Sequence, residues 1–257
     1  MLDSPRKYFA RYAERTKKEE TPAMRKGRIL HKWILEPDSF AAECIISPYE
    51  NYRTKEAQYW RAEMETKNVL IVSEKEREDY LKIVEAVWSD PVARPLLEGS
   101  QTELHGYAKD PETGLQLYSR PDLITSSGRI GDLKITRSAK QEKFTNQQFF
   151  DGYFIQQGFY AHVDEIINFQ KQDNPFYIAV EEEYPHITQV YSVTTTYLNM
   201  AKKKITKGLK NIRDMRTLDP GMKNKQLWPG YHFEEVPLSP KYGHLTSDND
   251  FTEFLEI

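Results

Sequence analysis

A hairpin pattern that carries acidic residues on both strands constrains the fold of this chain most strongly. It spans residues 117–139, LYSRPDLITSSGRIGDLKITRSA, in which apolar, strand-forming residues surround the turn signal TSSG at 125–128. A second turn signal, DPETG at 110–114, precedes it. Residues 101–136 are therefore predicted to form three short antiparallel strand stretches.

Helical patterns flank this segment on both sides. Apolar residues recur at helical spacing in five ranges: 2–15, 21–36, 55–67, 73–88 and 141–168. Ser73 with Glu76 forms a capping-box signature, and Thr21 with Pro22 marks another helix start. Two further strands are predicted at 175–183 and 186–194, followed by a basic helix at 196–215. We expect one large α/β unit with an irregular C-terminal segment.

The two turns also predict which residues face one another. A hairpin turn centred on Ser127 places Asp122 opposite Asp132, and Lys134 then shares their side because the strand period is two. The first turn places Glu103 opposite Asp122. Three carboxylates from adjacent strands are thus expected to lie in one row, with a lysine beside them.

Carboxylates this close raise one another's pKa unless a cation lies between them. Mg²⁺ favours a few carboxylate oxygens together with water and substrate phosphate, so the pattern indicates metal-assisted phosphodiester hydrolysis. Facing acids and lysines more often form a solvated surface with weak ion pairs. Here the intervening residues Leu123, Ile130 and Leu133 indicate a half-buried strand, which favours a site.

Composition excludes several other classes of protein. The 257 residues carry a formal charge of −3 and one cysteine, Cys44, so an intrachain disulfide, a four-cysteine zinc site and a four-cysteine cluster are excluded. No apolar run approaches the roughly 20 residues of a membrane helix, and no signal segment or glycine-rich phosphate loop is present. We expect a cytoplasmic protein with no membrane partner.

The charge is distributed unevenly along the chain. Residues 1–32 contain ten Lys or Arg against four acids, and residues 197–216 contain seven against one. Lys203, Lys207 and Lys210 fall on one face of the predicted helix. A solvated helix face is the simpler interpretation; a surface that follows DNA phosphates is the more specific one.

The order of several motifs resembles one nuclease family. Pro121-Asp122 followed by Asp132-Leu133-Lys134 resembles the PD-(D/E)xK signature. GRILH at 27–31 with LEP at 35–37, and QQGFY at 156–160, resemble elements of the RecE-like branch, the phage-type exodeoxyribonuclease VIII, related to lambda exonuclease and RecB-like nuclease domains. The resemblance covers most of the chain.

This resemblance implies a role for each matching residue. Asp122 and Asp132 would bind Mg²⁺, with two ions per site and Mn²⁺ as a substitute, and Lys134 would position the nucleophilic water. The further metal ligands would be Glu103, His31 and the Leu133 backbone carbonyl. The residues expected to contact DNA are Gln156, Tyr160, Arg120, Lys203, Lys207 and Lys210.

The resemblance also implies the fold and the activity. The fold would be a restriction-endonuclease-like core, a central mixed β-sheet flanked by helices, with an N-terminal helical extension. Residues 1–216 would form the nuclease domain and residues 217–257 an irregular C-terminal arm. The activity would be degradation of linear double-stranded DNA from its ends, 5′ to 3′, leaving 3′ tails for recombination.

Expected partners follow from the same resemblance. They are DNA ends, further copies of the chain in a ring (trimer or tetramer), and a single-strand annealing recombinase in a bacterial host cytoplasm, if the chain is encoded by a phage or prophage. Three alternatives stay open: a structure-specific or single-strand nuclease of the same superfamily, an inactive DNA-binding scaffold, and a domain whose DLK match is accidental. A Cas4-like protein is disfavoured because one cysteine cannot hold its cluster.

Overall fold

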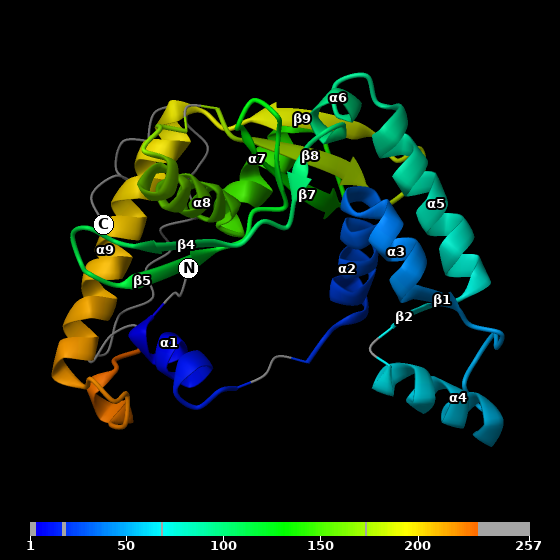
Figure 1. Ribbon diagram of the computed structural model, residues 1–257, viewed down its shortest axis with the longest axis horizontal. Coiled ribbons are helices and arrows are strands. Elements are labelled where there is room, and N and C mark those ends of the chain that lie inside the picture. Colours follow the sequence, from blue (N-terminus) through cyan, green and yellow to red (C-terminus); the bar gives the residue numbers. More distant parts are fainter. Residues whose placement is uncertain (1–3, 17–18, 68, 173, 231–257) are drawn as a thin grey trace, which may run out of the picture.

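A mixed five-stranded sheet forms the centre of the computed structural model, which describes residues 4–16, 19–67, 69–172 and 174–230 (Figure 1). The strands lie in the order β3 (Gln101–Thr102), β6 (Leu123–Ile124), β7 (Ile130–Thr136), β8 (Phe176–Glu181) and β9 (Thr188–Ser192). β7 and β8 are parallel, and the other neighbours are antiparallel. The predicted α/β fold with a central mixed sheet is confirmed.

Helices cover both faces of this sheet. Phe176, Ile178 and Val180 pack in one cluster with α2 (Pro22–Leu35) and α5 (Glu74–Ser89). Tyr177 and Ala179, which point the other way because strand side chains alternate, pack against Phe144 of α7 (Gln141–Phe150). β8 is therefore buried on both faces, as its nearly continuous apolar sequence requires.

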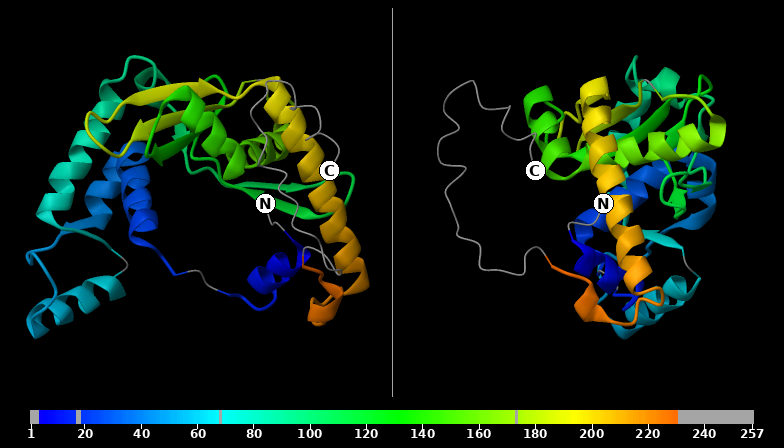
Figure 2. Two further views of the ribbon diagram at one scale, coloured as in Figure 1. Left: turned by 180° about the vertical axis from the view of Figure 1, so that it is seen from behind. Right: turned by 90° about the vertical axis from the view of Figure 1, so that its left-hand side faces the viewer.

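Two groups of elements extend from the same side of the sheet, so the molecule has the outline of an arch (Figures 1 and 2). One arm contains α9 (Thr195–Leu218), with α8 (Tyr153–Asn168) and the hairpin β4 (Gly106–Lys109) and β5 (Gln116–Ser119) beside it. The elements of the other arm, besides α2 and α5, are α3 (Pro37–Glu43), the parallel pair β1 (Cys44–Ile46) and β2 (Leu70–Val72), and α4 (Lys55–Thr66). The short α6 (Arg94–Leu97) follows α5.

The predicted hairpin register is confirmed. Leu123 pairs with Gly131 in β6–β7, the pairing that places Asp122 opposite Asp132. The backbone N–H of Glu103 donates to the carbonyl of Asp122 at 3.0 Å. Instead of three continuous stretches, however, the chain forms five strands. Glu103, which is left-handed with φ of 53°, separates β3 from β4, and residues 120–122 separate β5 from β6.

Local capping explains where most helices begin. Ser73 accepts a hydrogen bond from the Glu76 N–H, and the Glu76 side chain accepts one from the Ser73 N–H, so the predicted capping box is present. Thr21 and Thr194 cap α2 and α9 with one hydrogen bond each, since their side chains accept from the backbone N–H groups of Met24 and Tyr197. The predicted helix at 141–168 is instead two helices, because Gly152 adopts φ of 73° between α7 and α8.

The predicted basic helix is α9, which is 24 residues long. Its buried residues are Ala201, Ile205 and Leu209, whereas Lys203 and Lys207 are exposed on the opposite side. None of the helices in the described ranges has both the length and the apolar character that a membrane crossing requires.

The described part of the C-terminal arm packs against α1 (Pro5–Tyr12). Trp228, which follows the short 3-10 helix η1 (Lys225–Leu227), is fully buried and stacks on Tyr8 with ring centroids 5.7 Å apart. Its indole N–H donates to the Asp219 carboxylate at 3.0 Å. Residues 231–257 of the predicted arm lie outside the described residues, so the boundary at 216/217 stays a prediction.

Candidate active site

The β6–β7 hairpin brings the signature residues together. Asp122 lies directly before β6, and Asp132 is the third residue of β7. The Asp122 Oδ2 atom accepts a hydrogen bond from the Leu133 backbone N–H at 2.8 Å, and the Lys134 Nζ atom lies 2.5 Å from Asp132 Oδ2. Two acids from neighbouring strands and one lysine therefore form a compact cluster, as the register predicts.

Asp132 is the least satisfied polar group of this cluster. Its side chain is fully buried, and its Oδ1 atom has no hydrogen-bond partner within the described residues. Its Oδ2 atom is paired with the Lys134 ammonium. Because a buried carboxylate oxygen without a partner is costly, this carboxylate is suited to a bound divalent cation.

His31 reaches the cluster from α2. Its Nδ1 atom lies 3.5 Å from Asp122 Oδ2, and the side chain is three-quarters buried. Burial lowers the pKa of His31 to about 4, even though the nearby Asp132 carboxylate acts in the opposite direction. The imidazole is therefore neutral at pH 7 and offers a nitrogen lone pair, the form in which histidine binds metals.

The charged groups of the cluster shift one another's pKa values. Burial, and next the Asp132 carboxylate, raise the pKa of Asp122 well above its ordinary range. Burial alone would lower the pKa of Lys134, but the carboxylates of Asp132 and Asp122 outweigh it and raise that pKa. The two acids therefore favour the charged form of Lys134.

Glu103 is aligned with Asp122 in the backbone but its carboxylate points to another partner. Its Oε2 atom lies 2.8 Å from the Nε atom of Arg120, whose side chain is 52% exposed. Within the described part of the chain, no three His, Cys, Asp or Glu side chains are grouped as they would be around a metal ion. Two carboxylates with water and substrate oxygens suffice for Mg²⁺, so the cluster of Asp122 and Asp132 still fits the ion.

The QQGFY segment supports the lysine. The Lys134 ammonium donates to Gln156 Oε1 at 3.2 Å, and Gln156 Nε2 donates to the Tyr160 hydroxyl at 2.8 Å. Lys134 Nζ also lies 4.5 Å from the ring centroid of Tyr153, a cation–π contact that the sequence analysis missed. Tyr153 lies three residues before Gln156 and so on the same helix face, which is the signal that could have identified it.

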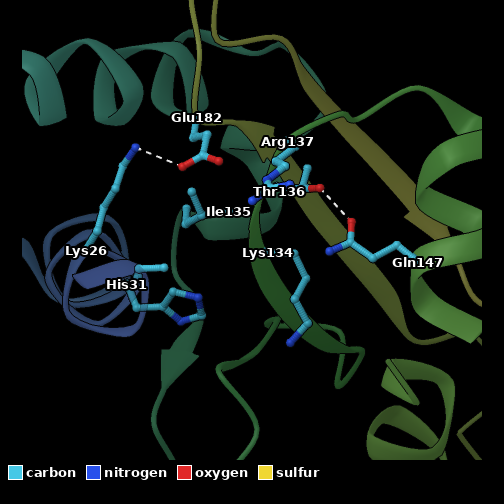
Figure 3. A pocket seen from close by; sticks show the side chains of 10 residues that line it. Lys26, His31, Lys134, Ile135, Thr136, Arg137, Gln147 and Glu182 are labelled. Atoms are coloured by element: carbon cyan, nitrogen blue, oxygen red, sulfur yellow. Dashed lines mark hydrogen bonds and ion pairs between the residues drawn. The ribbon is translucent and has the colours of Figure 1, made fainter. Parts of the chain in front are cut away.

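A pocket of about 420 Å³ opens beside the cluster, between the first half of α2 and the end of β7 (Figure 3). His31 and Lys134 point toward it, and Arg137 lines it from the chain after β7. Lys26 of α2 pairs at 3.1 Å with Glu182, which follows β8, and this ion pair joins the two sides of the pocket. The remaining lining residues are Ala23, Gly27, Ile135, Thr136 and Gln147. The basic residues Lys26 and Arg137 were not identified from the sequence.

The lysines of α9 are not part of this cluster. Figure 1 places α9 on the arm opposite α2, so Lys203 and Lys207 lie on a separate surface. Lys210 Nζ is paired with Glu112 Oε1 in the β4–β5 turn at 2.5 Å. Of the residues expected to contact DNA, only Gln156 and Tyr160 therefore adjoin the cluster directly, while Arg120 reaches it through Glu103.

Comparison with known proteins identifies a family. The model of the family described as PDDEXK-like domain of unknown function (DUF3799) matches residues 1–231. The fold aligns with the crystal structure of a candidate exonuclease of Eubacterium rectale at a TM-score of 0.58 and 14% identity, over 93% of this chain and 85% of that chain. A second crystal structure, of the protein SSO0001, aligns at a TM-score of only 0.30 with 13% identity, over 79% and 83% of the two chains, and supports no conclusion. No curated protein matches the sequence.

Proposed function

Because the chain belongs to the family of PDDEXK-like domains, we propose that it is a metal-dependent nuclease that hydrolyses DNA phosphodiesters. The observation that carries this proposal is the fully buried Asp132 carboxylate, which lies beside Asp122 and Lys134 and whose Oδ1 atom has no hydrogen-bond partner among the described residues. Membership of the RecE-like branch is part of the proposal, and the motif resemblance alone supports it.

In this proposal Asp122 and Asp132 hold the cation, which is Mg²⁺ with Mn²⁺ as a substitute. A bound divalent cation would polarise the phosphodiester and make water a better nucleophile at neutral pH. His31 is placed to contribute a nitrogen. A second ion would need Glu103 to leave Arg120, and the Leu133 carbonyl is a further candidate ligand.

The other residues of the cluster orient the reactants. Asp132, Gln156 and the ring of Tyr153 fix the Lys134 ammonium on three sides. Its N–H groups can donate to the attacking water or to a phosphate oxygen, an electrostatic contribution that grows in a partly buried site. Arg137 adds positive charge to the pocket, where a DNA phosphate would lie, whereas the charge of Lys26 is matched by Glu182.

The finer proposal is exonuclease activity on linear double-stranded DNA, 5′ to 3′, to give 3′ tails for recombination. The family resemblance supports it, and the structural neighbour described as a candidate exonuclease is consistent with it. A ring-shaped homo-oligomer and an annealing recombinase partner are proposed on the resemblance alone.

A digestion assay with three DNA forms, together with a binding measurement, tests the proposal. The protein is incubated in Mg²⁺ with a linear duplex, with the same duplex as a covalently closed circle and with one of its single strands, and a gel shift measures binding. We expect degradation of the linear form only, and end-labelled substrates then report the direction. Cleavage of the circle would indicate an endonuclease, digestion of single strands alone would indicate a single-strand nuclease, and metal-dependent binding without hydrolysis would indicate a scaffold.

A further inference from the structure

Exposed aromatic and basic side chains cover the face of the β4–β5 hairpin that points away from α8. Tyr107 pairs with Tyr118 across the two strands, and their ring centroids lie 5.1 Å apart. They are 69% and 47% exposed, although tyrosine rings usually bury most of their area in a folded protein. The His105 Nδ1 atom lies 3.0 Å from the Tyr118 hydroxyl, so three rings form one group.

The face of the hairpin that packs against α8 fixes the orientation of this group. Ala108 and Leu117 are buried in a cluster with Val163 of α8, so the alternate residues Tyr107 and Tyr118 point away from α8. The hairpin lies on the concave side of the arch (Figures 1 and 2). The rings are therefore presented on a supported surface toward the space between the arms.

The group is continuous with the candidate active site. Arg120 is exposed, as Tyr118 is, and it lies directly after β5, two residues before Asp122. Arg120 is half-exposed and pairs with Glu103, the residue that faces Asp122. At the far end of the hairpin Lys109 is also exposed. The aromatic rings thus lie between two cationic side chains, on a path that begins at the acids.

A purely structural role explains less of this arrangement. Cross-strand aromatic pairs stabilise hairpins, but they do so best when packing buries the rings, and Tyr107 is mostly exposed. Unpaired bases stack on exposed aromatic side chains regardless of sequence, while nearby cations bind the phosphates. Bases inside a duplex are already stacked and cannot use such a surface in this way.

We propose that His105, Tyr107, Tyr118 and Arg120 form a stacking platform for one unpaired DNA strand that leads to or from the Asp122–Asp132 cluster. This inference rests on the proposed nuclease function, since it names the single strand that the same site would receive or release. The platform would bind one strand after the duplex has unpaired and so would keep the two strands apart.

Binding measured in EDTA tests the platform without hydrolysis. Fluorescence anisotropy follows a labelled single-stranded oligonucleotide and a blunt duplex of the same sequence. Tyr107→Ala and Tyr118→Ala should each weaken single-strand binding by about tenfold, with little change for the blunt duplex. Tyr107→Phe and Tyr118→Phe keep the rings and should retain binding. Tyr59→Ala, at an exposed tyrosine of α4, is the matched control and should change nothing.

A bulk-preserving variant separates stacking from folding. Tyr107→Leu keeps an apolar side chain on the hairpin and should lose single-strand affinity without a large change in melting temperature. Unchanged single-strand affinity of the alanine variants, or an equal loss for blunt duplex, would overturn the proposal. So would a changed oligomeric state in light scattering with intact DNA binding, which would show an interface between copies. Absence of Mg²⁺-dependent hydrolysis by the wild type would contradict the nuclease function separately.

Discussion

The Lys134 ammonium lies 2.5 Å from Oδ2 of Asp132, so a side chain that lines the pocket is paired with a fully buried carboxylate. Gln156 and the ring of Tyr153 hold the same ammonium from α8. The lysine is thus fixed at the pocket wall while Asp132 keeps a second oxygen without a partner among the described residues. The arrangement separates two roles: Asp132 for holding a cation and Lys134 for acting on substrate.

Lys134→Met should therefore remove hydrolysis while leaving metal binding. We expect the nuclease rate to fall by at least about 100-fold, the usual loss when one oriented electrostatic group is removed from an active site. Lys140→Met, a lysine nearby in sequence whose side chain is 70% exposed, should stay within about twofold of wild type. A Lys134→Met rate within tenfold of wild type would contradict the role of the ammonium.

Mg²⁺ should stabilise the folded protein through Asp132. A ligand that binds only the folded state at 100 times its Kd adds about 2.7 kcal/mol to the free energy of unfolding, which raises Tm by several degrees in a protein of this size. Asp132→Asn should lose this increase, measured by differential scanning fluorimetry with and without Mg²⁺. Asp79→Asn, at a surface ion pair with Lys82, should keep it. An equal Mg²⁺ effect in Asp132→Asn would place the ion elsewhere.

The basic face of α9 should contribute phosphate contacts. Lys203→Glu combined with Lys207→Glu should weaken duplex binding and lower the slope of log K against log salt by about 2, since each phosphate contact contributes about 0.9. Lys210→Glu should have less effect because Lys210 is already paired with Glu112. Binding titrations at several salt concentrations measure the slope, and an unchanged slope in the double variant would show that this face does not contact DNA.

A buried carboxylate in the β4–β5 turn should make stability depend on pH. Burial alone would raise the pKa of Asp110, but hydrogen bonds from Thr113 and His162 outweigh it and lower that pKa. A lowered pKa in the folded state adds stability that is present above the unfolded-state pKa, near 3.9, and is lost as the pH falls through the folded value.

Asp110→Asn should therefore destabilise the protein by about 1 to 2 kcal/mol at pH 7, and this difference should shrink as the pH falls below about 4. Urea unfolding at pH 7 and at a pH below about 4 measures this difference in the free energy of unfolding. Glu112→Gln changes an exposed acid of the same turn and should cost under about 0.5 kcal/mol. A difference that is as large at low pH as at pH 7 would contradict the ionic contribution of Asp110.

The contact between α8 and α9 should depend on Gly158. A Cβ atom added there would lie 2.3 Å from the Cβ atom of Ala201, so the helices would have to move apart. Gly158→Ala should destabilise by about 1 to 3 kcal/mol. Gly27→Ala, in α2 with nothing within 4 Å of the added atom, should instead stabilise by about 0.5 to 1 kcal/mol. Thermal melts compare the two, and a Gly158→Ala protein as stable as wild type would contradict the close packing.

Local sequence signals were sufficient for the centre of the fold. The two turn signals at 110–114 and 125–128 determined which residues face one another, because hairpin register follows from turn position. That register alone brought Asp122, Asp132 and Lys134 to one side of the sheet. The caps at Thr21 and Ser73 marked two helix starts for the same reason: the capping side chain and its partner are close in sequence.

Contacts between distant segments could not be predicted in this way. The Glu103 carboxylate pairs with Arg120 and the Glu103 backbone is left-handed, and the sequence carries no signal for either feature. Lys26 and Arg137 meet at the pocket only after α2 packs on the sheet. His162 likewise pairs with Asp110 across 52 positions.

The most direct test of the account compares release of acid-soluble nucleotides from a linear DNA duplex by wild type and Asp132→Asn, each in Mg²⁺ and in EDTA. We predict release by the wild type in Mg²⁺ alone, and none by Asp132→Asn under either condition. Release by the wild type in EDTA, or undiminished release by Asp132→Asn in Mg²⁺, would contradict the claim that the Asp122–Asp132 cluster is a metal-dependent nuclease site.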